Sequence, residues 1–118
     1  MTGETRTAGE GGGAQWVRGV AELALLSLLG ERPHFGLEMV ERLRNEAALP
    51  IAEGTIYPLL HRLERAGLIG SQWRIEDGER PRKYYDLTAA GEAERDRQVG
   101  QWRRLSASLQ SFLTRTDP

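Results

Sequence analysis

Basic side chains and a histidine gather between residues 61 and 85, and their types suit the binding of a polyanion. Six basic residues stand there against four acidic ones, and the surplus concentrates at Arg80-Pro81-Arg82-Lys83. Arginine donates paired hydrogen bonds to phosphate and to guanine, whereas lysine acts as a compact positive charge. His61 adds a donor for a base edge or a phosphate. This stretch therefore predicts contact with a nucleic acid.

Catalytic chemistry finds little support in the chain. There is no cysteine, and the two histidines, His34 and His61, stand far apart. No Gly-x-Ser-x-Gly elbow or phosphate-binding loop occurs, and neither histidine has the spacing of a metal ligand. We expect His34 to lie in a turn. We also expect no enzymatic activity, no cofactor and no bound metal.

A helix expected over residues 52–66 positions the first part of the basic stretch. Its apolar residues recur every three or four positions, which predicts one buried face. The opposite face holds Gly54, Pro58, His61 and Arg65, with Tyr57 and Arg62 on its flanks. Thr55 and Tyr57 stand near the N-terminal end, which is the end that reaches bases in helix-turn-helix proteins.

Each of these residues also has an ordinary structural interpretation. His61 fits a solvated helix surface, and Thr55 and Tyr57 fit capping and packing. Arg65 could instead pair with Glu64 or Glu41. The hairpin that follows the helix favours the DNA interpretation for His61. For Thr55 and Tyr57 both interpretations stay open.

The hairpin consists of two expected strands, residues 68–75 and 83–87, joined by a turn that contains Asp77-Gly78. Ile69, Trp73 and Ile75 are in phase on the first strand. A helix followed by a basic hairpin is typical of a winged helix, in which the helix enters the major groove and the hairpin grips the flanking backbone or minor groove. The residues expected at DNA are Gly54, Thr55, Tyr57, His61, Arg62, Arg65, Arg80, Arg82, Lys83 and Tyr84.

Three further helices are expected, over residues 15–29, 35–47 and from Thr88 to about residue 113. The first is apolar nearly all round, so one side must face something beyond this small domain. The last carries an apolar stripe that needs a partner surface. Trp102 in this stripe fits an interface, or a wall that stacks on a planar molecule. The residues expected at a dimer interface or an effector pocket are Trp16, Val20, Val99, Trp102, Leu105 and Leu109.

The fold class expected is mostly α with a small β-hairpin, namely a winged helix-turn-helix with a C-terminal dimerisation helix. Residues 1–14 are Gly-, Thr- and Glu-rich and are expected to form a disordered tail. Residues 15–87 then form the DNA-binding domain, and residues 88–118 form the dimerisation helix. The net charge of −1 argues nothing for DNA by itself. With no signal peptide or apolar run long enough for a membrane, the cytoplasm is expected.

The chain resembles the PadR family of bacterial winged-helix transcriptional regulators, in its shorter branch with one C-terminal helix. The resemblance covers about residues 17–112 and rests on three motifs: Gly54-Thr55-Ile56-Tyr57-Pro58, Leu60-His61-Arg62-Leu63-Glu64 and Arg80-Pro81-Arg82-Lys83-Tyr84-Tyr85-Asp86-Leu87-Thr88. It implies a homodimer built by the first and last helices, a palindromic operator, repression, and in some relatives an aromatic or drug-like effector at the dimer centre. Family members often carry His-Gly-Tyr where this chain has Phe35-Gly36-Leu37.

Two rival functions remain open. A winged helix can serve protein–protein contact without DNA, and the near-neutral net charge mildly favours this. A small-molecule-binding dimer without an operator is the other. Retention on heparin or DNA-cellulose at low salt would separate the first rival from a DNA-binding protein.

Overall fold

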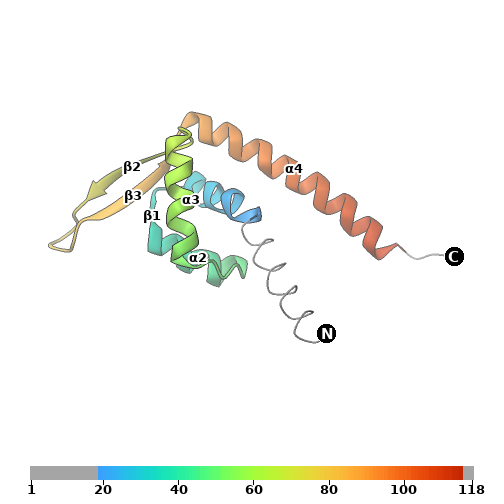
Figure 1. Ribbon diagram of the computed structural model, residues 1–118, viewed down its shortest axis with the longest axis horizontal. Helices are drawn as coiled ribbons and strands as arrows, with labels where there is room; N and C mark the ends of the chain where they lie inside the picture. The colour runs from blue at the N-terminus through green and yellow to red at the C-terminus, as the bar shows by residue number, and fades with distance from the viewer. Residues whose placement is uncertain (1–18, 116–118) are drawn as a thin grey trace.

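The computed structural model describes residues 19–115, which form a helical body and a small antiparallel sheet whose hairpin projects from one side (Figure 1). Residues 19–31 belong to the first helix. The later elements are β1 (His34–Phe35), α2 (Gly36–Ala47), α3 (Glu53–Arg65), β2 (Ile69–Arg74), β3 (Arg82–Leu87) and α4 (Ala89–Thr114). The strand order is β1-β3-β2. The expected winged helix is confirmed. The expected tail over residues 1–14, Trp16 and the start of the first helix lie outside the described residues.

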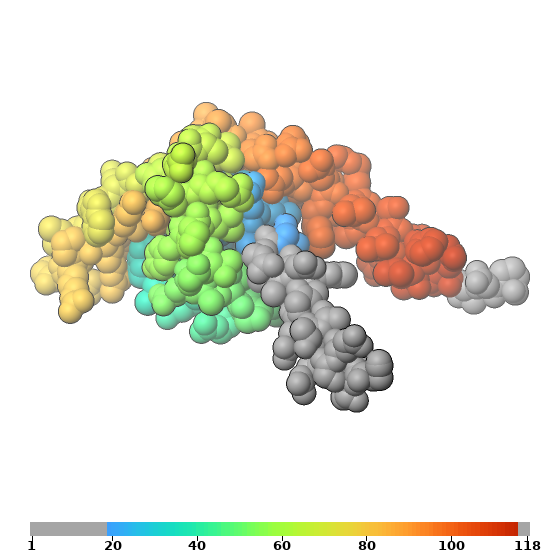
Figure 2. All heavy atoms as spheres, viewed as in Figure 1, coloured from blue at the N-terminus to red at the C-terminus, as the bar shows by residue number. Residues whose placement is uncertain are grey.

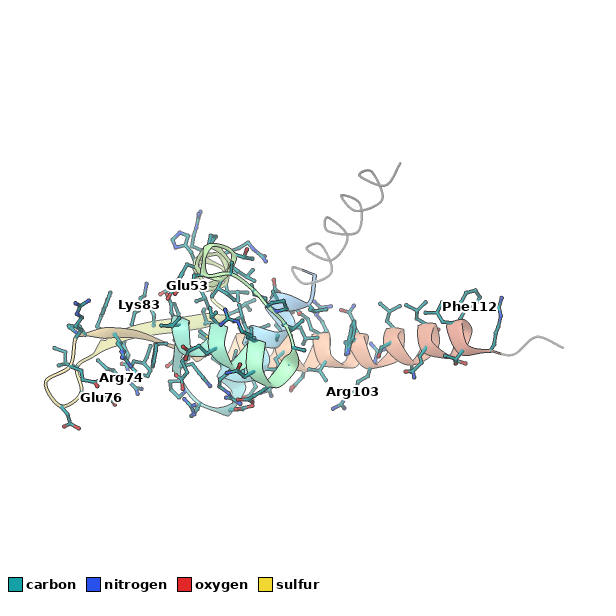
Figure 3. The ribbon with its side chains drawn as sticks, turned by 90° about the horizontal axis from the view of Figure 1, so that it is seen from below. Glu53, Arg74, Glu76, Lys83, Arg103 and Phe112 are labelled. Carbon is teal, nitrogen blue, oxygen red and sulfur yellow. The ribbon has the colours of Figure 1, made fainter. Side chains whose placement is uncertain are left out.

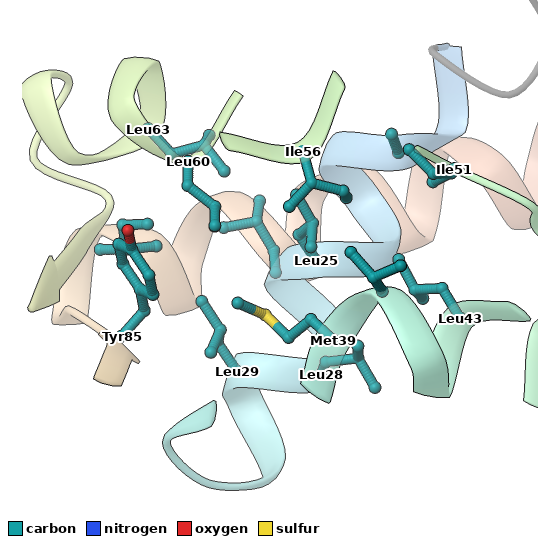
Figure 4. Packing of buried hydrophobic residues seen from close by; sticks show 14 residues of the cluster. Leu25, Leu28, Leu29, Met39, Leu43, Ile51, Ile56, Leu60, Leu63 and Tyr85 are labelled. Carbon is teal, nitrogen blue, oxygen red and sulfur yellow. The ribbon is translucent and has the colours of Figure 1, made fainter. Parts of the chain in front are cut away.

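The core lies where the first helix, α2 and α3 meet the sheet. Leu25, Met39, Ile56 and Leu60 are fully buried there, and Tyr85 from β3 closes one side (Figure 4). Each such side chain stabilises the fold by roughly 1.5–3 kcal/mol through its burial. Because the apolar face of α3 packs against the core, the opposite face of this helix is exposed to solvent.

The hairpin β2–β3 extends past this core. Ile69 pairs with Leu87 at the inner end and is buried, whereas Trp73 and Ile75 at the outer end are 67% and 68% exposed. The turn holds Asp77 at φ 47° and Gly78 at φ 75°, and the N–H of Glu79 donates to the carbonyl of Glu76 at 2.9 Å. Two successive positive φ angles are typical of a type I′ turn, which here lies within the loop of residues 75–81 between β2 and β3. The expected Asp77-Gly78 turn is therefore confirmed.

The expectation that His34 lies in a turn is wrong. His34 and Phe35 form β1, which pairs with Tyr85 and Tyr84 of β3, and the His34 side chain is fully buried. Phe35 is the N-cap of α2, and the carboxylate of Glu38 accepts from its N–H at 3.3 Å. A two-residue strand has no periodicity to detect, so only its partner in β3 defines it.

Burial and the neighbouring guanidinium groups favour the neutral form of His34. Nδ1 lies 2.8 Å from the carbonyl oxygen of Arg32, and Nε2 lies 2.8 Å from Nη1 of Arg42. The carbonyl only accepts and the guanidinium only donates, so this pairing assigns the ring proton to Nδ1. Burial lowers the pKa of His34 below its ordinary value, despite opposing contributions from the Arg32 carbonyl and Glu38, and the charges of Arg32 and Arg42 lower it further.

We therefore expect the protein to lose stability as the pH falls from about 7.5 to about 5.5, a window around the ordinary pKa of histidine, near 6.5. The folded state takes up its proton at lower pH than the unfolded chain, so acidification favours unfolding. His34→Gln should show a smaller change of melting temperature across this window, measured by circular dichroism. An equally large change in the variant would assign the pH dependence to another group.

The start of α4 is anchored tightly to the turn after α3. The Thr88 hydroxyl accepts from the N–H of Gly91 at 3.0 Å and donates to the carbonyl of Gly67 at 2.7 Å, so Thr88 is the N-cap of α4. From there α4 leaves the body, and Figure 2 shows it and the hairpin tip extending to opposite ends of the molecule. Within residues 19–115, no helix is long and apolar enough to cross a membrane.

Candidate nucleic-acid interface

The outer face of α3 is the first component of the site. Ile56, Leu60 and Leu63 point into the core, so helical periodicity turns Gly54, His61 and Arg65 outward, and all three are exposed. Ala52 caps the helix with no side-chain hydrogen bond. The exposed face of α3 therefore carries Gly54, the imidazole of His61 and the guanidinium of Arg65 in one row along the helix.

Tyr57 occupies the flank of α3 that faces α2. A Cβ atom on Gly36 would lie 2.5 Å from its ring, so the absence of a side chain at Gly36 lets the two helices approach. Tyr57 is still 42% exposed. Burial raises the pKa of Tyr57, and the charges of Glu53 and Tyr85 raise it further. The phenol therefore stays neutral and can both donate and accept.

Thr55 and Arg62 occupy the other flank of α3, which faces the first helix. Thr55 is half-buried, and Nη2 of Arg62 donates to Oε1 of Glu22 at 2.8 Å. Arg65 forms no ion pair with any residue of the described chain. Glu64 instead accepts from the Ser71 hydroxyl at 2.6 Å and lies 3.7 Å from Nζ of Lys83.

The strand register divides the basic hairpin residues between two faces. Lys83 pairs with Trp73, and Arg82 pairs with Arg74, so neighbouring residues of β3 point to opposite sides. Figure 3 shows Lys83 on the same side of the sheet as Glu53 at the start of α3, while Arg74 and Glu76 lie on the other side. Arg80 is exposed in the loop between the strands. The structure thus brings Lys83, and not Arg82 or Tyr84, to the side of α3.

Arg82 and Tyr84 belong to a stack of rings and guanidinium groups on the far face of the hairpin. Arg82 lies 4.4 Å from the centroid of the Phe35 ring, and Arg74 lies 4.6 Å from that of Tyr84. Phe35 and Tyr84 meet edge to face, with centroids 5.5 Å apart. Such cation–π and edge-to-face contacts each contribute about 0.5–1 kcal/mol when exposed. The stack ties the hairpin to β1.

Trp73 is a surface residue and is absent from the DNA contacts expected from the sequence. It stands across from Lys83 on the side of α3, and its indole is largely exposed. Trp73 is in phase with buried Ile69, which would predict burial. However, β2 extends beyond the core, so Trp73 has no core residues to pack against. Whether Trp73 is buried depends on how far the hairpin extends past the core, and the periodicity of the sequence does not give that length.

The C-terminal helix carries the apolar stripe expected from the sequence. Trp102 is 48% exposed and Leu109 44% exposed, and Leu105 is exposed as well. Val99 and Val20 are half-buried. Within the described chain, nothing covers this stripe, whereas Trp16 lies outside the described residues. Among residues 19–115, no group of three metal-binding side chains could hold a metal ion.

Comparisons with known proteins find transcriptional regulators, and a family model names their family. A model described as "Transcriptional regulator PadR-like family" matches residues 25–97. A PadR family transcriptional regulator of Eggerthella lenta has 29% identity and a TM-score of 0.80, covering 98% of this chain and 100% of that one. A Streptococcus transcriptional regulator has 34% identity and a TM-score of 0.75, covering 85% and 98%. Transcriptional regulator Rv3488 of Mycobacterium tuberculosis is 51% identical over 43 residues, which are 36% of this chain and 39% of that protein.

Proposed function

Since this chain belongs to the PadR-like family of transcriptional regulators, we propose that it binds a specific operator and represses transcription. The observation that carries this proposal is that α3 and the hairpin present basic and aromatic side chains on the same side of the molecule. His61 and Arg65 point outward from α3, and Lys83 and Trp73 stand on the same side of the wing. A helix beside a basic ribbon fits a major groove and its neighbouring backbone.

Within this proposal, α3 enters the major groove and the wing contacts the flanking strand. His61 and Arg65 reach base edges or phosphates, joined by Thr55, Tyr57 and Arg62 from the flanks of the helix. Lys83 and Arg80 bind phosphates, which fixes the register without reading sequence. Arg82 and Tyr84 act from the far face of the wing, where their stack with Phe35 keeps Lys83 turned toward the duplex.

Gly54 supports this orientation of α3. A glycine inside a helix costs about 1 kcal/mol relative to alanine. Packing within residues 19–115 does not require it, since a Cβ atom there would meet none of their atoms within 4 Å beyond its own helix backbone. The bare backbone in the first turn of α3 would instead let a phosphate or sugar of DNA come close.

We further propose that the protein acts as a homodimer on a palindromic operator in the cytoplasm. The exposed stripe of α4 is the surface that a second copy would cover, together with Val20 of the first helix. Two copies of α3 would then address half-sites about one helical turn, roughly 10 bp, apart or a multiple of it. A planar aromatic effector that stacks on Trp102 would release the operator by favouring another dimer geometry.

Selection of duplexes from a random-sequence DNA pool, followed by a gel shift across a salt series, tests this function. The wild-type chain should enrich a palindromic sequence and hold it against random competitor DNA. Failure to enrich any duplex would overturn the proposal. It would favour a protein-contact module, which the net charge of −1 suits better than it suits a nonspecific DNA binder.

Lys83→Ala and Trp73→Ala should weaken the complex in different ways. Removing one phosphate contact lowers the slope of log affinity against log salt by about one unit, so Lys83→Ala should shallow it. Trp73→Ala removes an apolar contact, so affinity should fall with the slope unchanged. Ser111→Ala, at an exposed position of α4 away from the hairpin, is the control. An unchanged slope in Lys83→Ala would remove this lysine from the interface.

A further inference from the structure

The carboxylate of Glu22 joins three helices. Oε1 accepts from Nη2 of Arg62 on α3 at 2.8 Å, and Oε2 accepts from Nε2 of Gln98 on α4 at 2.7 Å. The Glu22 side chain is only 22% exposed, so both bonds sit in a partly sheltered position. Each carboxylate oxygen of Glu22 thus bonds to a different helix, and this residue of the first helix connects α3 with α4.

Arg62 uses only one edge of its guanidinium in this link. Its other nitrogens bond to no residue between 19 and 115, and the side chain is 64% exposed. A guanidinium is planar and rigid, so fixing one nitrogen sets the direction of the remaining N–H donors. Those donors are available on the flank of α3 beside the face that carries His61.

Gln98 is itself fixed on α4. The same Nε2 that bonds to Glu22 also donates to Oε2 of Glu94 at 2.7 Å. Hydrogen bonds from Arg97 and Gln98 hold the pKa of Glu94 at about 2, so Glu94 stays a charged acceptor. The amide of Gln98 therefore keeps both donor bonds, and the position of α4 determines where Glu22 is held.

We infer that Glu22 and Gln98 are positioning residues that orient Arg62 for DNA and make this orientation depend on the position of α4. This inference rests on the proposed DNA-binding function. A shift of α4 that breaks the bond between Gln98 and Glu22 frees the carboxylate, and Arg62 then samples many rotamers. Ordering those rotamers again on DNA costs binding free energy, so the operator is bound less tightly.

A mutant cycle on DNA binding tests this link. The readout is the ratio of affinities for the duplex enriched by the wild-type chain and for a scrambled duplex of the same composition. Gln98→Leu removes the amide that holds Glu22, and it should lower the ratio about threefold to tenfold, within the range for residues that share one network. In an Arg62→Ala background the same change should have no effect. Glu22→Gln, which removes the charge, should also lose its effect in that background.

Gln101→Leu is the matched control, because Gln101 is an exposed glutamine of the same helix. It should leave the ratio unchanged. An unaltered ratio in Gln98→Leu, or an equal loss with and without Arg62, would overturn the inference while the proposed function stands. A wild-type chain that enriches no duplex would overturn both.

Discussion

In the proposed homodimer, Leu109→Glu is expected to separate the subunits and so to weaken binding to the proposed operator. Leu109 lies in the middle of the exposed stripe of α4, between Trp102 and Phe112. Burying a carboxylate without a partner costs several kcal/mol, so the proposed contact between two α4 stripes should not form. A lone subunit addresses one half-site, so operator affinity should fall about 100-fold or more, as expected when linked binding is lost.

Sedimentation of the free protein and a gel shift on the enriched duplex check this result together. Ser111→Glu adds the same charge to the opposite, polar side of α4 and should stay dimeric and active. A Leu109→Glu protein that remains a dimer would place the subunit interface on another surface, with the first helix the next to test.

Gly91→Ala is expected to unfold the protein at a much lower temperature. A Cβ atom at this position would lie 1.9 Å from the carbonyl oxygen of Leu68 and 2.7 Å from the Leu87 side chain. The Leu68 carbonyl cannot retreat easily, because it accepts from the N–H of Thr88 at 3.1 Å. Overpacking against backbone costs about 1–3 kcal/mol. In a domain of this size that lowers the melting temperature by on the order of 10 °C.

Gly54→Ala provides the comparison, since the same added methyl group meets open space there. It should melt at the same temperature as the wild type or higher, by the gain in helix propensity. Thermal unfolding followed by circular dichroism measures both variants. Equal melting temperatures for the two would mean that α4 can shift away from the α3–β2 turn at little cost.

The elements with a clear period could be predicted from the sequence to within a few residues. Ile56, Leu60 and Leu63 recur on one face of α3, and Asp77-Gly78 suits only a tight turn. The family resemblance, which rests on the helix and hairpin motifs, is also confirmed. Helix periodicity and turn preferences can be recognised in the sequence because they depend only on residues that are close together in the chain.

What escaped prediction depends on residues far apart in the chain. β1 exists because His34 and Phe35 meet β3 about 50 residues later, and Arg62 finds Glu22 40 residues earlier. The division of Arg82 and Lys83 between two faces follows from alternation, but only the fold tells which face turns toward α3. The candidate DNA contacts therefore stay predictions at the level of single residues.

The short length of β1 has a mechanical consequence. It pairs with β3 only at Tyr84 and Tyr85, so the hairpin beyond that point is a ribbon of two strands. Two-stranded ribbons twist and bend more readily than wider sheets. We therefore expect the wing to follow the width of the minor groove beside each half-site. Base pairs that no side chain touches would then affect affinity through groove width, with narrow A·T tracts preferred over G·C-rich flanks.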